Sequence, residues 1–181
     1  EHNALILEGR CVPYGEANVW WPVADALRHG AGIRSSDPAD KAIEMTRTAV
    51  CIALGEGADP SEVDRVHQGL LYLMGFDSEL RNIDPARARE DATAAVVTYA
   101  ERYSVHQPVV VVLSDLHWAD DLVLELVDTL LDRLSSRRFV VLATARQAVE
   151  ERWHPPHGRH NLVVVTLDPL TSESAEALLE M

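Results

Sequence analysis

Residues Val109–Asp121 read VVVVLSDLHWADD, and this stretch decides the fold class. It begins with five apolar residues, four of them β-branched, and runs into acidic and aromatic side chains. A continuous apolar run of this kind is typical of a strand buried on both faces of a parallel sheet. The polar residues then follow at the carboxyl end of the strand, the edge where open α/β sheets bind ligands. An acidic residue at that edge is the usual way to hold a metal ion beside a nucleotide phosphate.

Three other apolar runs predict further strands, and a fourth segment predicts a helix. Residues Asn3–Cys11, Phe139–Ala143 and Leu162–Leu167 are expected to be strands, the last two buried. Between the second and third strands, Ala119–Leu134 has apolar residues at helical spacing. A succession of strand, helix and strand implies a parallel sheet with helices on its faces. The predicted class is therefore α/β.

The region between the first two strands is predicted to be mainly helical. Three Asp–Pro pairs begin at Asp37, Asp59 and Asp84. Asp accepts hydrogen bonds from the free amides of a helix start, and Pro suits the first helical position. We expect helices over about 37–55, 59–75 and 84–104, after a shorter one that opens at Trp21–Pro22. Glu62 also stands at capping-box spacing from Asp59.

Composition limits the classes of function. The chain has 181 residues and a formal net charge of −13, which argues against direct contact with nucleic acid by this segment. No window is long and apolar enough for a membrane span, and no signal peptide opens the chain. Cys11 and Cys51 are read as reduced residues of a cytoplasmic protein, with a disulfide as the alternative. Because the first residue is Glu, we expect a segment of a longer protein.

Five motifs occur in an order that resembles a known family. They are GRCVPYGE at 9–16, WP at 21–22, LSDLHWADD at 113–121, LATAR at 142–146 and LDPLTSESAEALL at 167–179. Together they resemble the ATPase module of the STAND class of P-loop NTPases, as found in large bacterial regulators. Those regulators join the module to an adenylate or guanylate cyclase domain, to a LuxR-type DNA-binding domain or to helical repeats. The resemblance covers essentially the whole chain.

The resemblance implies a fold and a domain organisation. The fold would be a three-layer parallel sheet of P-loop NTPase type, with a helical insertion between the first and second strands present. Residues 1–181 would form a partial ATPase domain. Within it, residues 16–104 would be the insertion, and 105–181 would hold the Walker B segment, the sensor and the last strand.

The resemblance also implies a nucleotide site for ATP or ADP with Mg²⁺. VVVVLSD corresponds to the Walker B strand, so Asp115 would bind Mg²⁺ and orient the attacking water, with Asp120 as a second catalytic acid. Arg146 matches the sensor residue that faces the γ-phosphate, for which its planar donors are suited. Other residues implied around the nucleotide are Ser114, His117, Arg10 and Tyr14.

Two departures from the family pattern affect the expected activity. No G-x-x-x-x-G-K-[ST] loop occurs in the chain, so the phosphate cradle and its strand are expected just upstream of Glu1. In the family that strand lies between the strands at Phe139 and Leu162, and without it core residues are expected to be exposed. The family also has two adjacent acids where this chain has Ser114–Asp115. We therefore expect weak, absent or merely regulatory hydrolysis.

Each candidate residue also has a structural interpretation. Asp120 and Asp121 suit a helix N-terminus, whose dipole favours acids. His117 could make a structural hydrogen bond, and Arg146 could be a surface residue paired with an acid. Arg10 and Tyr14 could hold their loop, and Trp118 is expected to pack between strand and helix. A solvated loop accounts better than a metal site for the histidines at 154, 157 and 160.

Three functions remain open from the sequence. The first is a nucleotide-binding module whose ATP occupancy switches the arrangement of domains in a regulator. The second is a non-catalytic interaction or scaffold fragment that does not bind ATP. The third is a metal-dependent hydrolase that uses Asp115, His117 and Asp120, which is the weakest because these ligands crowd one turn.

Overall fold

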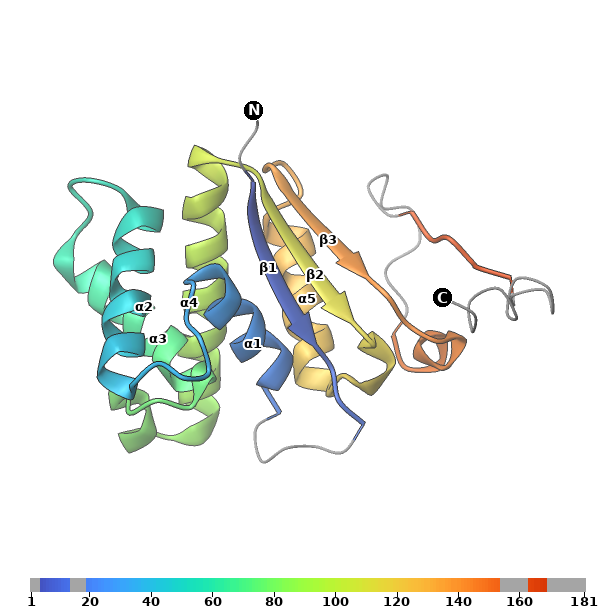
Figure 1. Ribbon diagram of the computed structural model, residues 1–181, viewed down its shortest axis with the longest axis horizontal. Helices are drawn as coiled ribbons and strands as arrows, with labels where there is room; N and C mark the ends of the chain where they lie inside the picture. Colours follow the sequence, from blue (N-terminus) through green and yellow to red (C-terminus); the bar gives the residue numbers. More distant parts are fainter. Residues whose placement is uncertain (1–3, 14–18, 154–162, 169–181) are drawn as a thin grey trace.

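The computed structural model describes residues 4–13, 19–153 and 163–168 (Figure 1). Its elements in chain order are β1 (Leu5–Arg10), α1 (Trp21–Gly30), α2 (Ala39–Leu54), α3 (Pro60–Met74), η1 (Glu79–Asn82), α4 (Pro85–His106), β2 (Val109–Ser114), η2 (Leu116–Trp118), α5 (Asp121–Arg133), β3 (Phe139–Ala143) and η3 (Gln147–Glu151). The helices α1 to α4 all lie between β1 and β2 in the sequence, as the Asp–Pro pattern predicted.

The three strands form one parallel sheet in the order β1-β2-β3. Leu5 is opposite Val109 at one end of the first pair, and Arg10 is opposite Ser114 at the other. In the second pair, Val109 is opposite Phe139. The α/β class with a parallel sheet is confirmed, and the VVVVLS run is its central strand.

Two of the three Asp–Pro helix starts have the expected cap. The carboxylate of Asp59 accepts a hydrogen bond from the Ser61 amide, and that of Asp84 accepts from the amides of Ala86 and Arg87. Asp37 was predicted to act in the same way, but this prediction is wrong. Its carboxylate instead accepts from the Arg34 amide and the Lys41 Nζ, and the helix begins one residue later, after Pro38.

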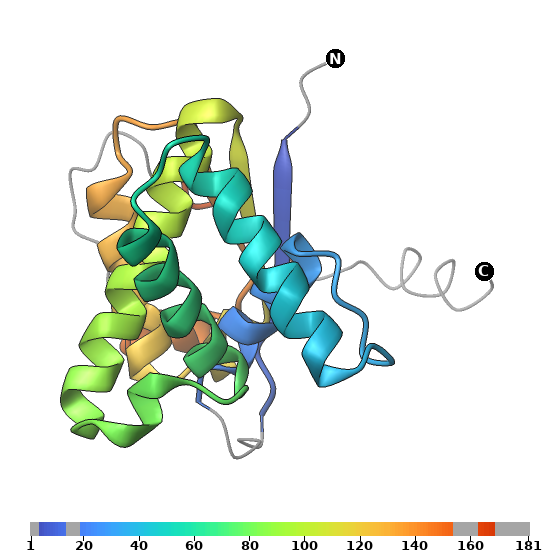
Figure 2. The same ribbon diagram turned by 90° about the vertical axis from the view of Figure 1, so that its left-hand side faces the viewer.

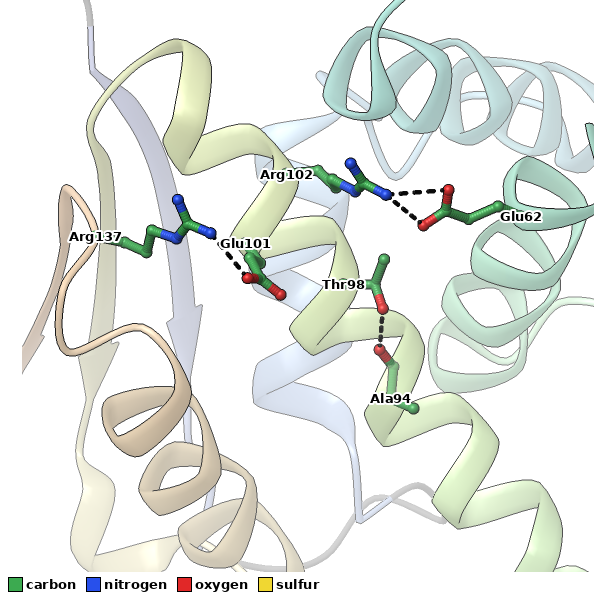
Figure 3. Close-up of polar contacts among 6 residues, drawn as sticks. All are labelled: Glu62, Ala94, Thr98, Glu101, Arg102 and Arg137. Carbon is green, nitrogen blue, oxygen red and sulfur yellow. Dashed lines mark hydrogen bonds and ion pairs between the residues drawn. The ribbon is translucent and has the colours of Figure 1, made fainter. Parts of the chain in front are cut away.

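Ion pairs attach α4 to elements on two sides (Figure 3). Arg102 on α4 donates two hydrogen bonds to the Glu62 carboxylate on α3, at 3.0 and 3.2 Å. Glu62, which stands at capping-box spacing from Asp59, therefore pairs with a residue of another helix. Glu101 accepts from Arg137, which precedes β3, at 3.0 Å. A side chain whose spacing suggested a role at the start of α3 thus forms a contact between α3 and α4.

One face of the sheet is covered by helices. A small apolar cavity of about 40 Å³ at this interface is lined by residues of α1, α4, α5 and all three strands. Leu7, Val111 and Leu113 are buried there. Gly9 lies on the same side, and a Cβ on it would be 2.0 Å from the carbonyl oxygen of Pro22 in α1. The approach of α1 to β1 therefore requires glycine at this position.

The opposite face of the sheet has no helix over it in the described part of the chain. Figure 1 shows α5 behind the strands and α2, α3 and α4 beyond the β1 edge of the sheet, the side that faces the viewer in Figure 2. Ile6, Val140 and Leu142 are exposed on the uncovered face, the last two at 58% each. The prediction that the strands at 109 and 139 are buried on both faces is therefore wrong. Only the helix-covered side of β2 is fully buried, and β3 has no described strand on its outer edge.

The predicted strand at Leu162–Leu167 is also not found. Residues 163–168 have no regular secondary structure, and Val163, Val164, Val165 and Leu167 are 72% to 85% exposed. A strand needs a neighbour for its backbone groups, and none of the described strands pairs with this stretch. The helix expected after Thr171 lies outside the described residues.

Cys11 is buried and Cys51 is exposed, and both are free, as predicted. The helices within the described ranges include none with the length and apolar character needed to cross a membrane.

Gly9→Ala should lower the free energy of unfolding by about 1–3 kcal/mol, because the added methyl group must push α1 away from β1. Urea denaturation measures the change. Glu8→Ala, at the adjacent exposed position of β1, is the control and should change stability by less than about 0.5 kcal/mol. Equal stability of the Gly9→Ala variant and the natural chain would contradict the proposed contact.

His67 predicts a pH dependence of stability. It is buried in α3, its Nε2 is 3.2 Å from the Ile43 carbonyl oxygen of α2, and its Nδ1 has no hydrogen-bond partner among the described residues. Burial lowers the pKa of His67 below its usual 6.5, and nearby Arg47 acts in the same direction while the Ile43 hydrogen bond and Asp64 oppose it. The unfolded chain therefore binds the proton more readily, and stability should fall as the pH drops below about 6.5.

Unfolding free energies measured from pH 8 to pH 5 test this dependence. His67→Gln keeps a side-chain N–H donor but does not titrate, so its stability should fall less than that of the natural chain. Parallel curves for the two proteins would show that His67 is not the responsible group.

Candidate functional site

The three strands end at one edge of the sheet, which holds most of the residues predicted to form a site. Because the strands are parallel, Arg10 at the end of β1, Ser114 at the end of β2 and the residues after Ala143 of β3 share this edge (Figure 1). The Cys11 amide donates to the Ser114 carbonyl oxygen at 2.9 Å, which extends the pairing one residue beyond β1.

Asp115, directly after β2, has an unusual backbone conformation. Its φ of 59° and ψ of 39° are left-handed, and no other non-glycine residue in the described ranges has a positive φ. For a residue with a Cβ, this conformation costs about 1–2 kcal/mol. It turns the chain so that the Leu116 amide donates to the Thr144 carbonyl oxygen at 2.8 Å. Strain of this kind is often found where a side chain is held for function.

The Asp115 carboxylate is engaged by a cation from the neighbouring strand. Oδ2 accepts a hydrogen bond from Arg10 Nε at 3.0 Å, in an ion pair exposed to solvent. The Asp115 amide donates to Thr144 Oγ1 at 3.3 Å. Groups at the ends of all three strands are thus joined at Asp115.

The loops after β2 and β3 are also joined through His117 and Arg146. His117 is in η2, and its Nδ1 accepts a hydrogen bond from the Arg146 amide at 3.3 Å. Arg146 is exposed and immediately precedes η3. The structure therefore brings Arg10, Asp115, His117 and Arg146 together through side-chain or backbone contacts.

Asp120 and Asp121 have partners that belong to the helix start. The Asp120 carboxylate accepts from the Leu122 amide at 3.0 Å and caps α5. Asp121 accepts from Arg152 at 2.6 Å. These contacts favour the capping interpretation of Asp120 over a catalytic one. Among the described residues, no three or more His, Cys, Asp or Glu side chains lie together as a metal site would require.

Cys11 lies beside the site, directly after β1. Burial, together with the negative charge of nearby Asp115, raises the pKa of the Cys11 thiol to about 11. The thiol is therefore protonated at neutral pH, and thiolate is the reactive form.

One residue near this edge differs from its prediction, and several others lie outside the described residues. Trp118 was expected to pack between strand and helix, but its side chain is 45% exposed and contacts the His117 ring at a centroid distance of 4.9 Å. Tyr14 and the histidines at 154, 157 and 160 lie outside the described residues. Thr144 lies within the LATAR motif but was not predicted to be a site residue, although its position directly after a predicted strand could have identified it.

An open groove of about 410 Å³ lies elsewhere on the molecule, along α1, α2 and α4. Its lining residues include Lys41, Glu44, Met45 and Tyr103, and none of the strand-end residues.

Comparisons with protein-family models, with curated proteins and with solved structures found no match for this chain.

The strain at Asp115 predicts how substitutions there change stability. Asp115→Gly should be more stable than Asp115→Ala by about 1 kcal/mol, because glycine adopts the left-handed conformation without a Cβ. Asp115→Asn should lie between them, since Asn tolerates this conformation better than Ala. Chemical denaturation of the three variants measures the order, and an alanine variant as stable as the glycine variant would contradict the strain.

Proposed function

We propose that this chain is part of an ATP-binding regulatory module of a bacterial signalling or transcriptional regulator in the cytoplasm, with weak or absent hydrolysis. The observation that carries the proposal is the meeting of Arg10, Asp115 and the Arg146 loop at the carboxyl edge of a parallel sheet. This edge is where open α/β sheets bind ligands. The family resemblance of the same motifs supports the choice of ATP among ligands.

The side chains at this edge suit a nucleotide with its metal ion. The Asp115 carboxylate would provide an oxygen ligand for Mg²⁺, and the Ser114 hydroxyl would contact the ion or its water. Mg²⁺ in such sites is held by one or two carboxylates together with substrate phosphates and waters. A single available carboxylate therefore fits an ion that arrives with ATP rather than one held by the protein alone. The exposed Arg146 guanidinium would pair with phosphate oxygens.

Three features predict that hydrolysis is weak or absent. Ser114 carries no charge where the family has an acid, and Asp115 is paired with Arg10. The sequence also contains no phosphate-binding loop of the P-loop type. The phosphate cradle would therefore have to come from polypeptide other than these 181 residues. On this proposal, ATP occupancy alters the arrangement of attached cyclase, DNA-binding or helical repeat domains.

A scaffold fragment without ATP binding is the second candidate. The Arg10–Asp115 ion pair favours it, because a cation already neutralises the carboxylate that the metal would need. The pair is exposed, however, and such pairs contribute only about 0–1 kcal/mol, so bound Mg²⁺ and phosphate could replace it.

Calorimetric titration with ATP and Mg²⁺ separates the two candidates. The measurement uses this chain and a longer polypeptide in which a phosphate loop precedes it. We expect weak binding by the chain and clear binding by the longer polypeptide. Arg146→Ala should weaken the latter by about 10- to 100-fold, because charge-assisted hydrogen bonds to phosphate are lost. Arg137→Ala is the matched control, since Arg137 precedes β3 at the opposite end of the strand and pairs with Glu101.

Absence of nucleotide binding in the longer polypeptide would refute the proposal and leave the scaffold interpretation. Robust Mg²⁺-dependent turnover, abolished by Asp115→Asn, would instead overturn the part that concerns weak hydrolysis.

A further inference from the structure

The loop after β3 is attached along its length to the segment that follows β2. Its first residue, Thr144, contacts the Asp115 and Leu116 amides. Farther along, Arg152 donates to the Ala119 carbonyl oxygen at 3.0 Å and to Asp121. Trp153 Nε1 donates to Asp128 Oδ2 on α5 at 3.1 Å. Arg146 lies between these two anchored ends.

His117 is the side chain that fixes the middle of this loop. The Arg146 amide donates to His117 Nδ1, so Nδ1 is unprotonated and the proton of the neutral ring is on Nε2. Nε2 is buried and has no partner among the described residues. Neither ring nitrogen is therefore presented to a ligand at the sheet edge. Of the two interpretations given for His117, a residue near the nucleotide and a structural hydrogen bond, this contact corresponds to the second.

We propose that His117 is a positioning residue, which holds the Arg146 backbone, and with it the point from which the Arg146 side chain extends, beside the turn that carries Asp115. The role of the guanidinium in reading phosphate rests on the proposed function, whereas the positioning itself does not. Because η2 directly follows Asp115, the bond to His117 also connects the Asp115 turn to the loop that holds Arg146.

Amide hydrogen exchange of the full chain, measured residue by residue by NMR, tests the positioning. His117→Phe keeps a ring but removes the acceptor, and it should speed exchange of the Arg146 amide about five- to tenfold, as expected for loss of one hydrogen bond. His117→Asn places an amide oxygen close to the position of Nδ1 and should restore most of the protection. Trp118→Phe is the matched control, because Trp118 contacts the His117 ring without bonding to Arg146.

The Leu116 amide provides an internal reference, since it donates to the Thr144 carbonyl oxygen and not to His117. Faster exchange of Arg146 alone in His117→Phe, with recovery in His117→Asn, supports the inference. If both amides exchange faster in His117→Phe, recovery of Arg146 in His117→Asn still supports it. Unchanged Arg146 exchange in His117→Phe overturns it, and so does exchange in His117→Asn as fast as in His117→Phe.

The exchange measurement uses no nucleotide, so its result is independent of the calorimetric titration. Loss of Arg146 protection together with a failed titration would retain His117 as a positioning residue and reject the ATP site. A successful titration with unchanged Arg146 exchange would retain the ATP site and reject His117 as a positioning residue.

Discussion

β2 pairs with a neighbour on each side, and both pairings are parallel. The rest of the structure depends on this constraint. Parallel strands must be joined by crossovers, and helices α1 to α4 form the first of them. Parallel strands also end at one edge, so Arg10, Asp115 and Thr144 become neighbours although they follow different strands. The left-handed turn at Asp115 then directs the chain into η2, where His117 meets Arg146.

Helices cover the two faces of this sheet unequally. Parallel sheets are usually covered on both faces, whereas α1, α4 and α5 lie over one face here and Val140 and Leu142 remain exposed on the other. The outer edge of β3 has no described partner strand, and the apolar stretch at 163–167 is exposed as well. An exposed edge strand and large apolar areas favour association between molecules.

The sequence predicted elements well where local chemistry decides them. The β-branched run at 109–113 became β2, and Asp59 and Asp84 cap their helices. Most of the failed predictions involve contacts distant in sequence, whereas the cap expected at Asp37 is replaced by contacts with nearby Arg34 and Lys41. Glu62 pairs with Arg102, and the strand expected at 162–167 lacks a neighbour. Within the site, the end of β2 could be located, but the Arg10–Asp115 pair spans 105 residues and the His117–Arg146 contact spans 29. Local spacing contains no signal for either contact.

Chemical-shift mapping with ATP and Mg²⁺ tests most directly whether the strand ends form one nucleotide-responsive site. Amide spectra of the full chain are recorded as both are added to millimolar concentration, which detects even weak binding. The account predicts shifts confined to the ends of β1, β2 and β3, including the amides of Cys11, Asp115 and Arg146. Shifts confined to the groove along α1, α2 and α4, or no shifts at all, would contradict it.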